Sequence, residues 1–321
     1  MTALNADDPQ QPGRLQRLHS ATRRAPSPRA QRAILVVAAV GFIAGGWFAL
    51  KSLDVSLAEV RWPPLLIAAL VGVPLTLVAN TFEYLLSGRM LHHRIQLLPA
   101  LQLTTISTAA NLLPIPGAFL VRIQGLRALG SGTGKALAST MVIALVWIGI
   151  SSLLAGILLA FSESWIASVT LAAVGVITLV GAYVWLVRAV PEKGERRRIA
   201  MLAVAIELFA VVTNAARLVL ILIGLRVDAS LGQALVLAVS SSLAAAAGIF
   251  PGGLGLRELI AALLAPLVGL PASAGFAATA INRVMGIIVL APITAVLALR
   301  SPQGSQGRQP PTETDEAGAD R

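Results

Sequence analysis

The sequence predicts an all-α polytopic membrane protein, with about six full transmembrane helices plus two re-entrant helical hairpins in an inverted repeat. Hydrophobic residues make up 56% of the 321 residues, charged residues make up only 12%, and the mean hydropathy is +0.79. Soluble domains average roughly 25% charged residues. The apolar runs are continuous, rich in Ala and Leu and near membrane length, which favours helices over a strand barrel. Much of the surface is therefore expected to face lipid.

The composition also limits which kinds of functional site the protein can contain. There is no cysteine, so thiolate metal sites, disulfides and cysteine nucleophiles are excluded. Only three histidines are present, His19, His92 and His93, and we expect no metal site and no cofactor. The net charge of +10 is attributed to the cytoplasmic side of a membrane and to anionic headgroups, not to nucleic acid.

The chain divides into three parts. Residues 1–32 are rich in Arg and Pro without an apolar run, which predicts a disordered basic cytoplasmic arm. No cleavage site follows the apolar stretch that begins at Ala33, so we expect a retained anchor. Residues 33–299 form the transmembrane domain, and residues 300–321 form a disordered cytoplasmic tail. Full spans are predicted at 33–50, 64–86, 136–161, 165–187, 200–225 and 272–298.

Two segments between these spans are expected to enter the membrane and turn back. Residues 97–133 turn at Pro114-Ile115-Pro116-Gly117, and residues 233–270 break at Pro251-Gly252-Gly253. With both hairpins re-entrant, the cytoplasmic segments hold 17 basic residues, leaving aside Arg321, and the external loops hold only Lys51, Arg61 and Arg226. This asymmetry predicts a protein of the cell membrane with both termini in the cytoplasm.

The two hairpins share a motif. Pro116 and Gly117 precede Arg122 with the same spacing that separates Pro251 and Gly252 from Arg257. Each motif follows a hydroxyl-rich half-helix, and the two units face opposite ways, as in secondary transporters built from inverted repeats. A chance match in a chain rich in Gly and Ala is the alternative.

This geometry predicts an anion site. A half-helix that starts after Pro116-Gly117, or after Pro251-Gly252-Gly253, directs free N–H groups and a positive dipole end into the membrane. Arg122 and Arg257 then lie about one and a half turns further on, and an Arg fork can grip a phosphate. The alternative for each Arg is snorkelling to headgroups or pairing with an acid, such as Glu258 beside Arg257.

Other intramembrane polar residues fit such a site. Glu207, Asn214 and Arg217 lie on one predicted span; the first two either line a cavity or make internal contacts that fix helix packing. Arg217 is near the outer end and is expected to snorkel. Arg283 is near the middle of its span, where it cannot snorkel. We expect Arg122, Arg257 and Arg283 to line one cavity, with Glu258 and Glu207 as the nearest acids.

A minor expectation concerns Glu83, which lies near the cytoplasmic end of its span. Arg89 follows six residues later, so a local pair is predicted.

The residues around both turns resemble a known family. Phe250-Pro-Gly-Gly-Leu-Gly-Leu-Arg-Glu258 is similar to the proline–double-glycine signature of the lysylphosphatidylglycerol synthase transmembrane-region family, the flippase-like membrane proteins. Asn111-Leu-Leu-Pro-Ile-Pro-Gly-Ala-Phe-Leu-Val-Arg122 resembles its first signature, and Arg283 matches the Arg of its last helix. The resemblance covers residues 33–299. It implies a domain that translocates or binds lipid, without the soluble aminoacyl-transferase domain.

Three functions stay open at this stage. The first is a flippase for an anionic phospholipid or a polyprenyl-phosphate-type lipid. The second is an intramembrane enzyme that acts on a lipid phosphate, for which Ser240–Ser242 and Glu258 could be proposed as nucleophile and base. The third is a non-catalytic subunit that binds lipid for a partner. The oligomeric state is left open.

Overall fold

The computed structural model describes residues 28–53, 58–112, 117–162, 164–247 and 255–300, and all the secondary structure in these residues is helical. The elements are α2 (Pro28–Ser52), α3 (Trp62–Ile67), η1 (Ala68–Gly72), α4 (Val73–Met90), α5 (Leu97–Leu112), α6 (Gly117–Ala128), α7 (Thr133–Leu159), α8 (Trp165–Ala189), α9 (Lys193–Gly224), α10 (Leu231–Ala247), α11 (Leu256–Leu264), η3 (Ala265–Val268) and α12 (Ala272–Arg300). The predicted arm up to residue 27 and the tail from residue 301 lie outside the described residues.

The helical membrane fold is confirmed. Among the described residues, five helical stretches are long and apolar enough to cross a bilayer, namely Trp62–Met90, Thr133–Leu159, Trp165–Ala189, Lys193–Gly224 and Ala272–Leu297. They coincide with five of the six predicted spans, and α2 covers the sixth, 33–50. The exact number of crossings stays a prediction. On α8, large apolar side chains such as Ile177 and Trp165 are exposed, which suits a surface in contact with lipid.

Helix ends follow local backbone chemistry. Pro63 and Pro64 open α3, where the missing N–H groups would have no partner in any case. Gly269 ends η3 with φ 75°, in the left-handed region that glycine adopts without cost. Trp62–Met90 runs through η1, one π-helical stretch, without a break.

Two short helix pairs occupy the positions predicted for the hairpins. In the first, α6 folds back along α5, because Ala100 near the start of α5 and Leu126 near the end of α6 belong to one hydrophobic cluster. A hydrogen bond of 2.7 Å between the His93 and Ser131 side chains joins the same ends. In the second, Gln233 at the start of α10 donates to the Val268 carbonyl at the end of η3, at 2.8 Å. With 16, 12, 17 and 9 residues, these helices are shorter than the ~20 residues of a full span. Re-entry into the membrane stays a prediction.

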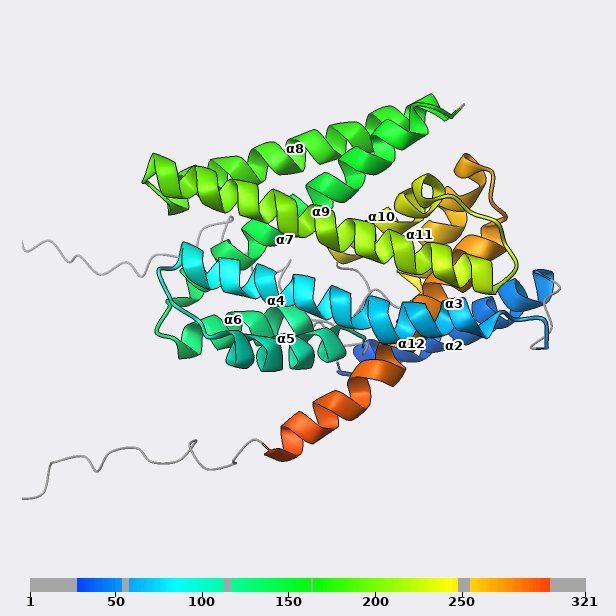
Figure 1. Cartoon of the computed structure of the whole chain (residues 1–321), viewed down its shortest axis with the longest axis horizontal. Coiled ribbons are helices and arrows are strands. Elements are labelled where there is room, and N and C mark those ends of the chain that lie inside the picture. The colour runs from blue at the N-terminus through cyan, green and yellow to red at the C-terminus, as the bar shows by residue number, and fades with distance from the viewer. Residues whose placement is uncertain (1–27, 54–57, 113–116, 163, 248–254, 301–321) are drawn as a thin grey trace, which may run out of the picture.

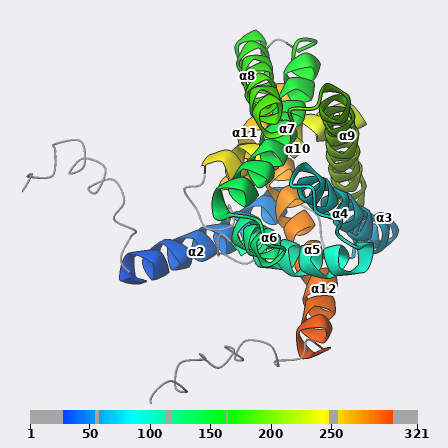
Figure 2. The same ribbon diagram turned by 90° about the vertical axis from the view of Figure 1, so that its left-hand side faces the viewer.

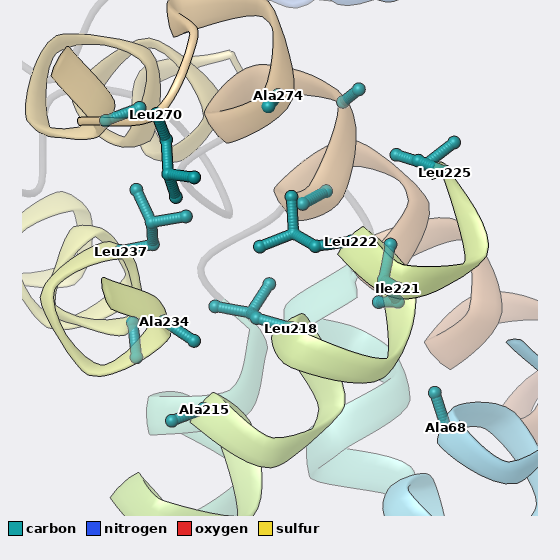
Figure 3. Packing of buried hydrophobic residues seen from close by; sticks show 14 of the residues in the cluster. Ala68, Ala215, Leu218, Ile221, Leu222, Leu225, Ala234, Leu237, Leu270 and Ala274 are labelled. Carbon is teal, nitrogen blue, oxygen red and sulfur yellow. The ribbon is translucent and has the colours of Figure 1, made fainter. Parts of the chain in front are cut away.

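The largest buried cluster lies where α9, α10 and α12 meet (Figure 3). Leu218 and Leu222 of α9 pack there against Leu237 of α10 and Ala274 of α12. Helix α12 contacts both α5 and α11, so it lies between the two helix pairs. At Gly275 a side chain would collide with the Ala261 carbonyl, so small residues set how closely α12 approaches α11.

Basic residues gather at one end of the bundle. The α4–α5, α6–α7 and α8–α9 connections lie together at one end of the long axis (Figure 1), and the α3, α10 and α12 starts lie at the other. Seen along this axis, α2 and the last turns of α12 reach away from the bundle (Figure 2). Among described residues, the first end carries Arg89, Arg94, Arg127, Lys135, Arg188, Lys193, Arg196, Arg197 and Arg198, and the second carries Lys51, Arg61 and Arg226.

Candidate functional site: two buried charge clusters

The first cluster starts from the backbone that opens α11. Gly255 has φ 80°, a conformation that favours glycine, and its N–H donates to Glu258 Oε2 at 2.9 Å. The carboxylate of Glu258 therefore caps the helix on which it lies, next to the positive end of the helix dipole. Its side chain is fully buried.

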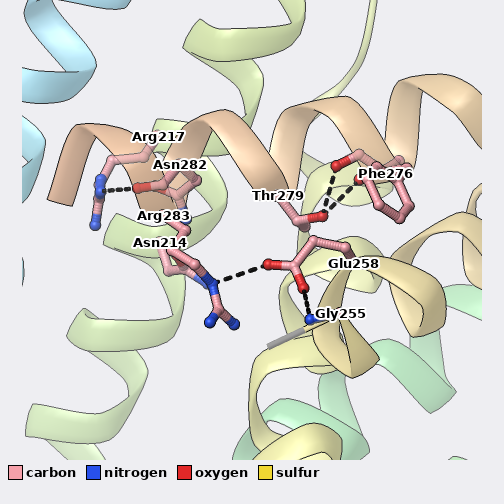
Figure 4. A network of polar contacts seen from close by, with 9 residues as sticks. Asn214, Arg217, Gly255, Glu258, Phe276, Thr279, Asn282 and Arg283 are labelled. Carbon is pink, nitrogen blue, oxygen red and sulfur yellow. Dashed lines mark hydrogen bonds and ion pairs between the residues drawn. The ribbon is translucent and has the colours of Figure 1, made fainter. Parts of the chain in front are cut away.

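Arg283 of α12 meets the same carboxylate. Its Nε lies 3.0 Å from Glu258 Oε1, and the Arg283 side chain is only 4% exposed (Figure 4). Counted along the candidate span Ala272–Leu297, Arg283 is roughly 16 Å from its start and 21 Å from its end at 1.5 Å per residue. The ion pair therefore lies near the middle of the span.

Arg217 of α9 enters the cluster from the other side. Its guanidinium donates to Thr76 Oγ1 at 3.1 Å and to the Asn282 carbonyl at 3.4 Å. The expectation that Arg217 snorkels is wrong, because the residue is only 7% exposed. Gly72 explains why: a Cβ there would collide with the Arg217 side chain, so the absence of one lets Arg217 lie across η1.

Asn214 ties two helices together in the same place. The Asn282 side-chain amide donates to Asn214 Oδ1 at 3.1 Å, so Asn214 makes the internal contact that was one of its two predicted roles. Neither Thr76 nor this bond was expected from the sequence, because each joins helices far apart along the chain.

Arg257 is the remaining cation of this cluster. It is half-buried, and its Nε has no hydrogen-bond partner among the described residues. The charges of Glu258 and Arg283 act on it, and its own charge acts on Arg217. We call Arg217, Arg257, Glu258 and Arg283 the arginine cluster. It holds three cations and one carboxylate.

A second buried cluster forms around the first helix pair. Arg122 of α6 donates from Nη1 to Glu83 Oε2 of α4 at 2.8 Å, with side chains only 16% and 11% exposed. The predicted pair between Glu83 and Arg89 is therefore wrong. Glu207 of α9 is fully buried, and the charges of Glu83 and Arg122 act on it. Glu83, Arg122 and Glu207 are called the carboxylate cluster, with two carboxylates and one cation.

The predicted site residues thus fall into two groups. The structure brings Arg257, Glu258, Arg283 and Asn214 together. It places Arg122 and Glu207 in the carboxylate cluster, where Arg122 has its own acidic partner. Gly117 is the first residue of α6, whereas Pro116, Pro251, Gly252 and Gly253 lie outside the described residues. Whether the two turns meet stays a prediction.

The similarity of this chain to a known protein family agrees with these motifs. The family described as the lysylphosphatidylglycerol synthase transmembrane region matches residues 33–293. The chain belongs to this family. No curated protein matches it. Membership makes the chain a membrane protein related to lipid handling.

Buried hydroxyl groups without a partner occur on both short helix pairs of this family member. Thr104 and Ser107 of α5 and Ser240 of α10 are buried, and their hydroxyl oxygens have no hydrogen-bond partner among the described residues. They are the half-helix residues singled out in the sequence. Because most buried polar atoms in proteins have a partner, they mark places where water or a polar ligand can bind.

Two further features carry less weight. A groove of about 520 Å³ runs between the start of α8 and the end of α11, lined by residues such as Trp165, Leu171 and Leu264. No arginine lines it, so the charge chemistry lies elsewhere. No group of three metal-ligating side chains occurs in the described part of the chain.

Proposed function

We propose that the protein binds and translocates an anionic lipid, a phospholipid or a polyprenyl-phosphate-type lipid, and holds its phosphate at the arginine cluster. The observation that carries this proposal is the excess of positive charge inside a helical membrane domain. The arginine cluster holds three arginines, and Glu258 is its one carboxylate among the described residues. A lipid phosphate would supply the missing negative charge.

The excess of positive charge inside the membrane domain is energetically costly without a bound anion. An uncompensated Arg near the centre of a membrane helix costs at least ~2.5–3.5 kcal/mol. Arg283 pairs with Glu258, and the partners of Arg217 among the described residues are neutral oxygens. Arg257 has no acid of its own in the described part of the chain, since both oxygens of the neighbouring Glu258 face Gly255 and Arg283. A phosphate oxygen pair fits its planar fork and also neutralises Arg217.

Unpartnered hydroxyl groups on both short helix pairs support translocation over binding alone. The unpartnered hydroxyls of α5 and α10 lie on the two short helix pairs, and transporters of inverted-repeat type place such broken helices around the substrate. Family membership, as a lipid-handling membrane protein, agrees with a lipid substrate. We take the protein to act without chemical change of the lipid.

Reconstitution tests this function. Liposomes that contain only this protein are loaded with fluorescent phosphatidylglycerol or phosphatidylcholine, and the outer leaflet is bleached chemically. We expect faster bleaching of the anionic lipid than in protein-free liposomes. Binding without faster bleaching would indicate a lipid-binding subunit, and release of phosphate would indicate an enzyme.

Arg257→Lys tests the site. Lysine keeps the charge but loses the two-pronged hydrogen bonds, so translocation of the anionic lipid should fall about tenfold or more. Arg188→Lys is the matched control, because Arg188 is exposed near the end of α8, and it should leave the rate unchanged. Equal rates for both variants, at equal protein levels, would remove Arg257 from the site.

The orientation is part of the proposal. The basic end of the bundle is assigned to the cytoplasm of the cell, with both termini on that side. The chain has no native cysteine, so Thr133→Cys and Asp228→Cys each introduce one thiol, at opposite ends of the bundle. In intact cells an impermeant maleimide should label the cysteine at 228 and not the one at 133. The reverse pattern would invert the topology.

A further inference from the structure

Glu207 is the one fully buried carboxylate of the carboxylate cluster, and neither of its oxygens has a hydrogen-bond partner among the described residues. Glu83 of α4 and Arg122 of α6 are the charged groups that act on it. Tyr84 is the other titratable group near these residues, and its hydroxyl lies against Gly125 of α6.

The other helices packed against α9 bring no further acid or base to Glu207. Helices α3, η1 and α10 carry no charged residue, and α7 and α8 carry theirs near their ends, Lys135 and Arg188. Helix α12 contributes Arg283, which belongs to the arginine cluster. Among the described residues, the cation that acts on Glu207 is therefore Arg122, which already donates to Glu83 at 2.8 Å.

Two carboxylates with one cation cannot both stay ionised at low cost in an apolar interior. An unpaired buried carboxylate is accepted there mainly in its neutral, protonated form. A neighbouring carboxylate adds repulsion, as in other sites where two acids share one proton. In such a site the acid that pairs with the cation is ionised, and the other acid holds a proton.

We propose that Glu207, Glu83 and Arg122 form a proton-binding site that couples proton movement to lipid translocation. In the described state Arg122 pairs with Glu83 and Glu207 carries the proton. When Arg122 moves to Glu207, the Glu207 O–H bond breaks and its proton leaves, while a proton binds Glu83. The total charge is the same before and after, so the step needs no other reactant.

The coupling rests on the proposed function and has a structural route. Glu207 and Arg217 lie on the same helix, ten residues apart, or about 15 Å along the axis. Arg217 belongs to the arginine cluster. A lipid phosphate that binds near Arg217 therefore acts on α9, the helix that also carries Glu207.

Infrared difference spectra test proton binding directly. The purified protein in phosphatidylglycerol liposomes is held at neutral pH, where exposed carboxylates are ionised, and the carbonyl band of protonated carboxylic acids is recorded in H₂O and D₂O. Glu207→Gln keeps the size and neutrality of the protonated acid, so the fold should persist, with an unchanged thermal midpoint, and the D₂O-sensitive band should disappear. Glu192→Gln, at an exposed acid before α9, is the control and should keep the band. The same band in Glu207→Gln would overturn the proton site.

A pH gradient across the same liposomes tests coupling. In the wild-type protein the gradient should change the initial rate of phosphatidylglycerol translocation by roughly tenfold, within the usual range of coupling between sites. Glu207→Gln should still translocate lipid but ignore the gradient. Wild-type translocation that ignores the gradient would overturn the coupling and leave the proposed function intact. If wild-type protein translocates no lipid under any condition, the proposed function and the coupling both fail, and the infrared band still decides proton binding.

Discussion

Arg122 and Arg257 stand at matching places in the two helix pairs, each six residues after a Pro-Gly step. Their surroundings differ. Arg122 meets Glu83, an acid from another helix, at 2.8 Å. Arg257 lies beside Glu258, whose oxygens are directed at Gly255 and Arg283. A repeated motif has thus led to one closed ion pair and one cation without an acid of its own.

The two clusters also differ in net charge. The carboxylate cluster has two acids and one Arg, whereas the arginine cluster has one acid and three Arg. An excess of acid in an apolar interior favours proton uptake, and an excess of Arg favours an anion, because arginine does not titrate away at physiological pH. This difference agrees with the proposed proton binding at the first cluster and the proposed phosphate binding at the second.

The strongest test of the difference between the two clusters is the same substitution at Arg122 and at Arg257. Arg122→Gln removes the cation that pairs with the buried carboxylate of Glu83 and should lower the unfolding free energy by about 3–5 kcal/mol at neutral pH. Arg257→Gln removes one of three cations and should leave stability unchanged or raise it. Thermal or denaturant unfolding of purified protein in detergent, without added anionic lipid, measures both.

The pH dependence of the unfolding free energy provides a control for the Arg122→Gln and Arg257→Gln variants. Acid neutralises the carboxylate that Arg122→Gln leaves unpaired, so the loss of stability in that variant should shrink as the pH falls. Equal losses of stability in the two variants would mean that the clusters do not differ as described.

The two helix pairs can also be compared by how tightly a glycine is packed in each. A Cβ at Gly275 would meet the backbone of Ala261, with its carbonyl carbon at 2.9 Å, whereas a Cβ at Gly125 would meet the ends of the Leu103 and Tyr84 side chains. Backbone cannot move aside easily and side-chain ends can. We expect Gly275→Ala to cost about 1–3 kcal/mol and Gly125→Ala less.

Gly181→Ala serves as the control for these packing variants. Nothing lies within 4 Å of a Cβ at Gly181, so this change should stabilise the helix by about 0.5–1 kcal/mol. The ranking is read from unfolding midpoints of the three variants. A larger loss at Gly125 than at Gly275 would contradict the packing described for α12 and α11.

The smallest expected effect concerns the amide pair that joins α9 to α12. Asn214→Ala removes the acceptor of the 3.1 Å bond from Asn282, and such bonds between membrane helices average about 0.6 kcal/mol. Asn282→Ala should cost a similar amount, and the double variant should cost little more than either single one. Additive losses in this double-mutant cycle would mean that the two amides act independently.

Much of the architecture could be predicted from composition and spacing. Continuous apolar runs placed five of the predicted spans on observed long helices, and the Pro-Gly steps separated the short helices of each pair. These signals are local, because hydropathy and backbone preference belong to each residue wherever it lies.

Pairing of charges was predicted less well, for a geometric reason. Glu258 and Arg257 are adjacent, and Glu83 and Arg89 are six apart, so on a helix neither pair faces the same way. The observed partners come from other helices: Arg283 for Glu258 and Arg122 for Glu83. The position of Arg217 near the outer end of its span predicts snorkelling, and the sequence gives no sign that Gly72 would lie against it.

The sequence by itself determined that this chain is a helical membrane protein, where its helices run, and that a few charged residues must lie inside them. Only the tertiary structure decided which of these charges neutralise one another. Burial in lipid is a property of each segment, whereas an ion pair depends on a distance between segments, such as the 2.8 Å that joins Glu83 to Arg122 across 39 positions of the chain. An ion pair of that kind appears only when the helices that carry its two members pack side by side.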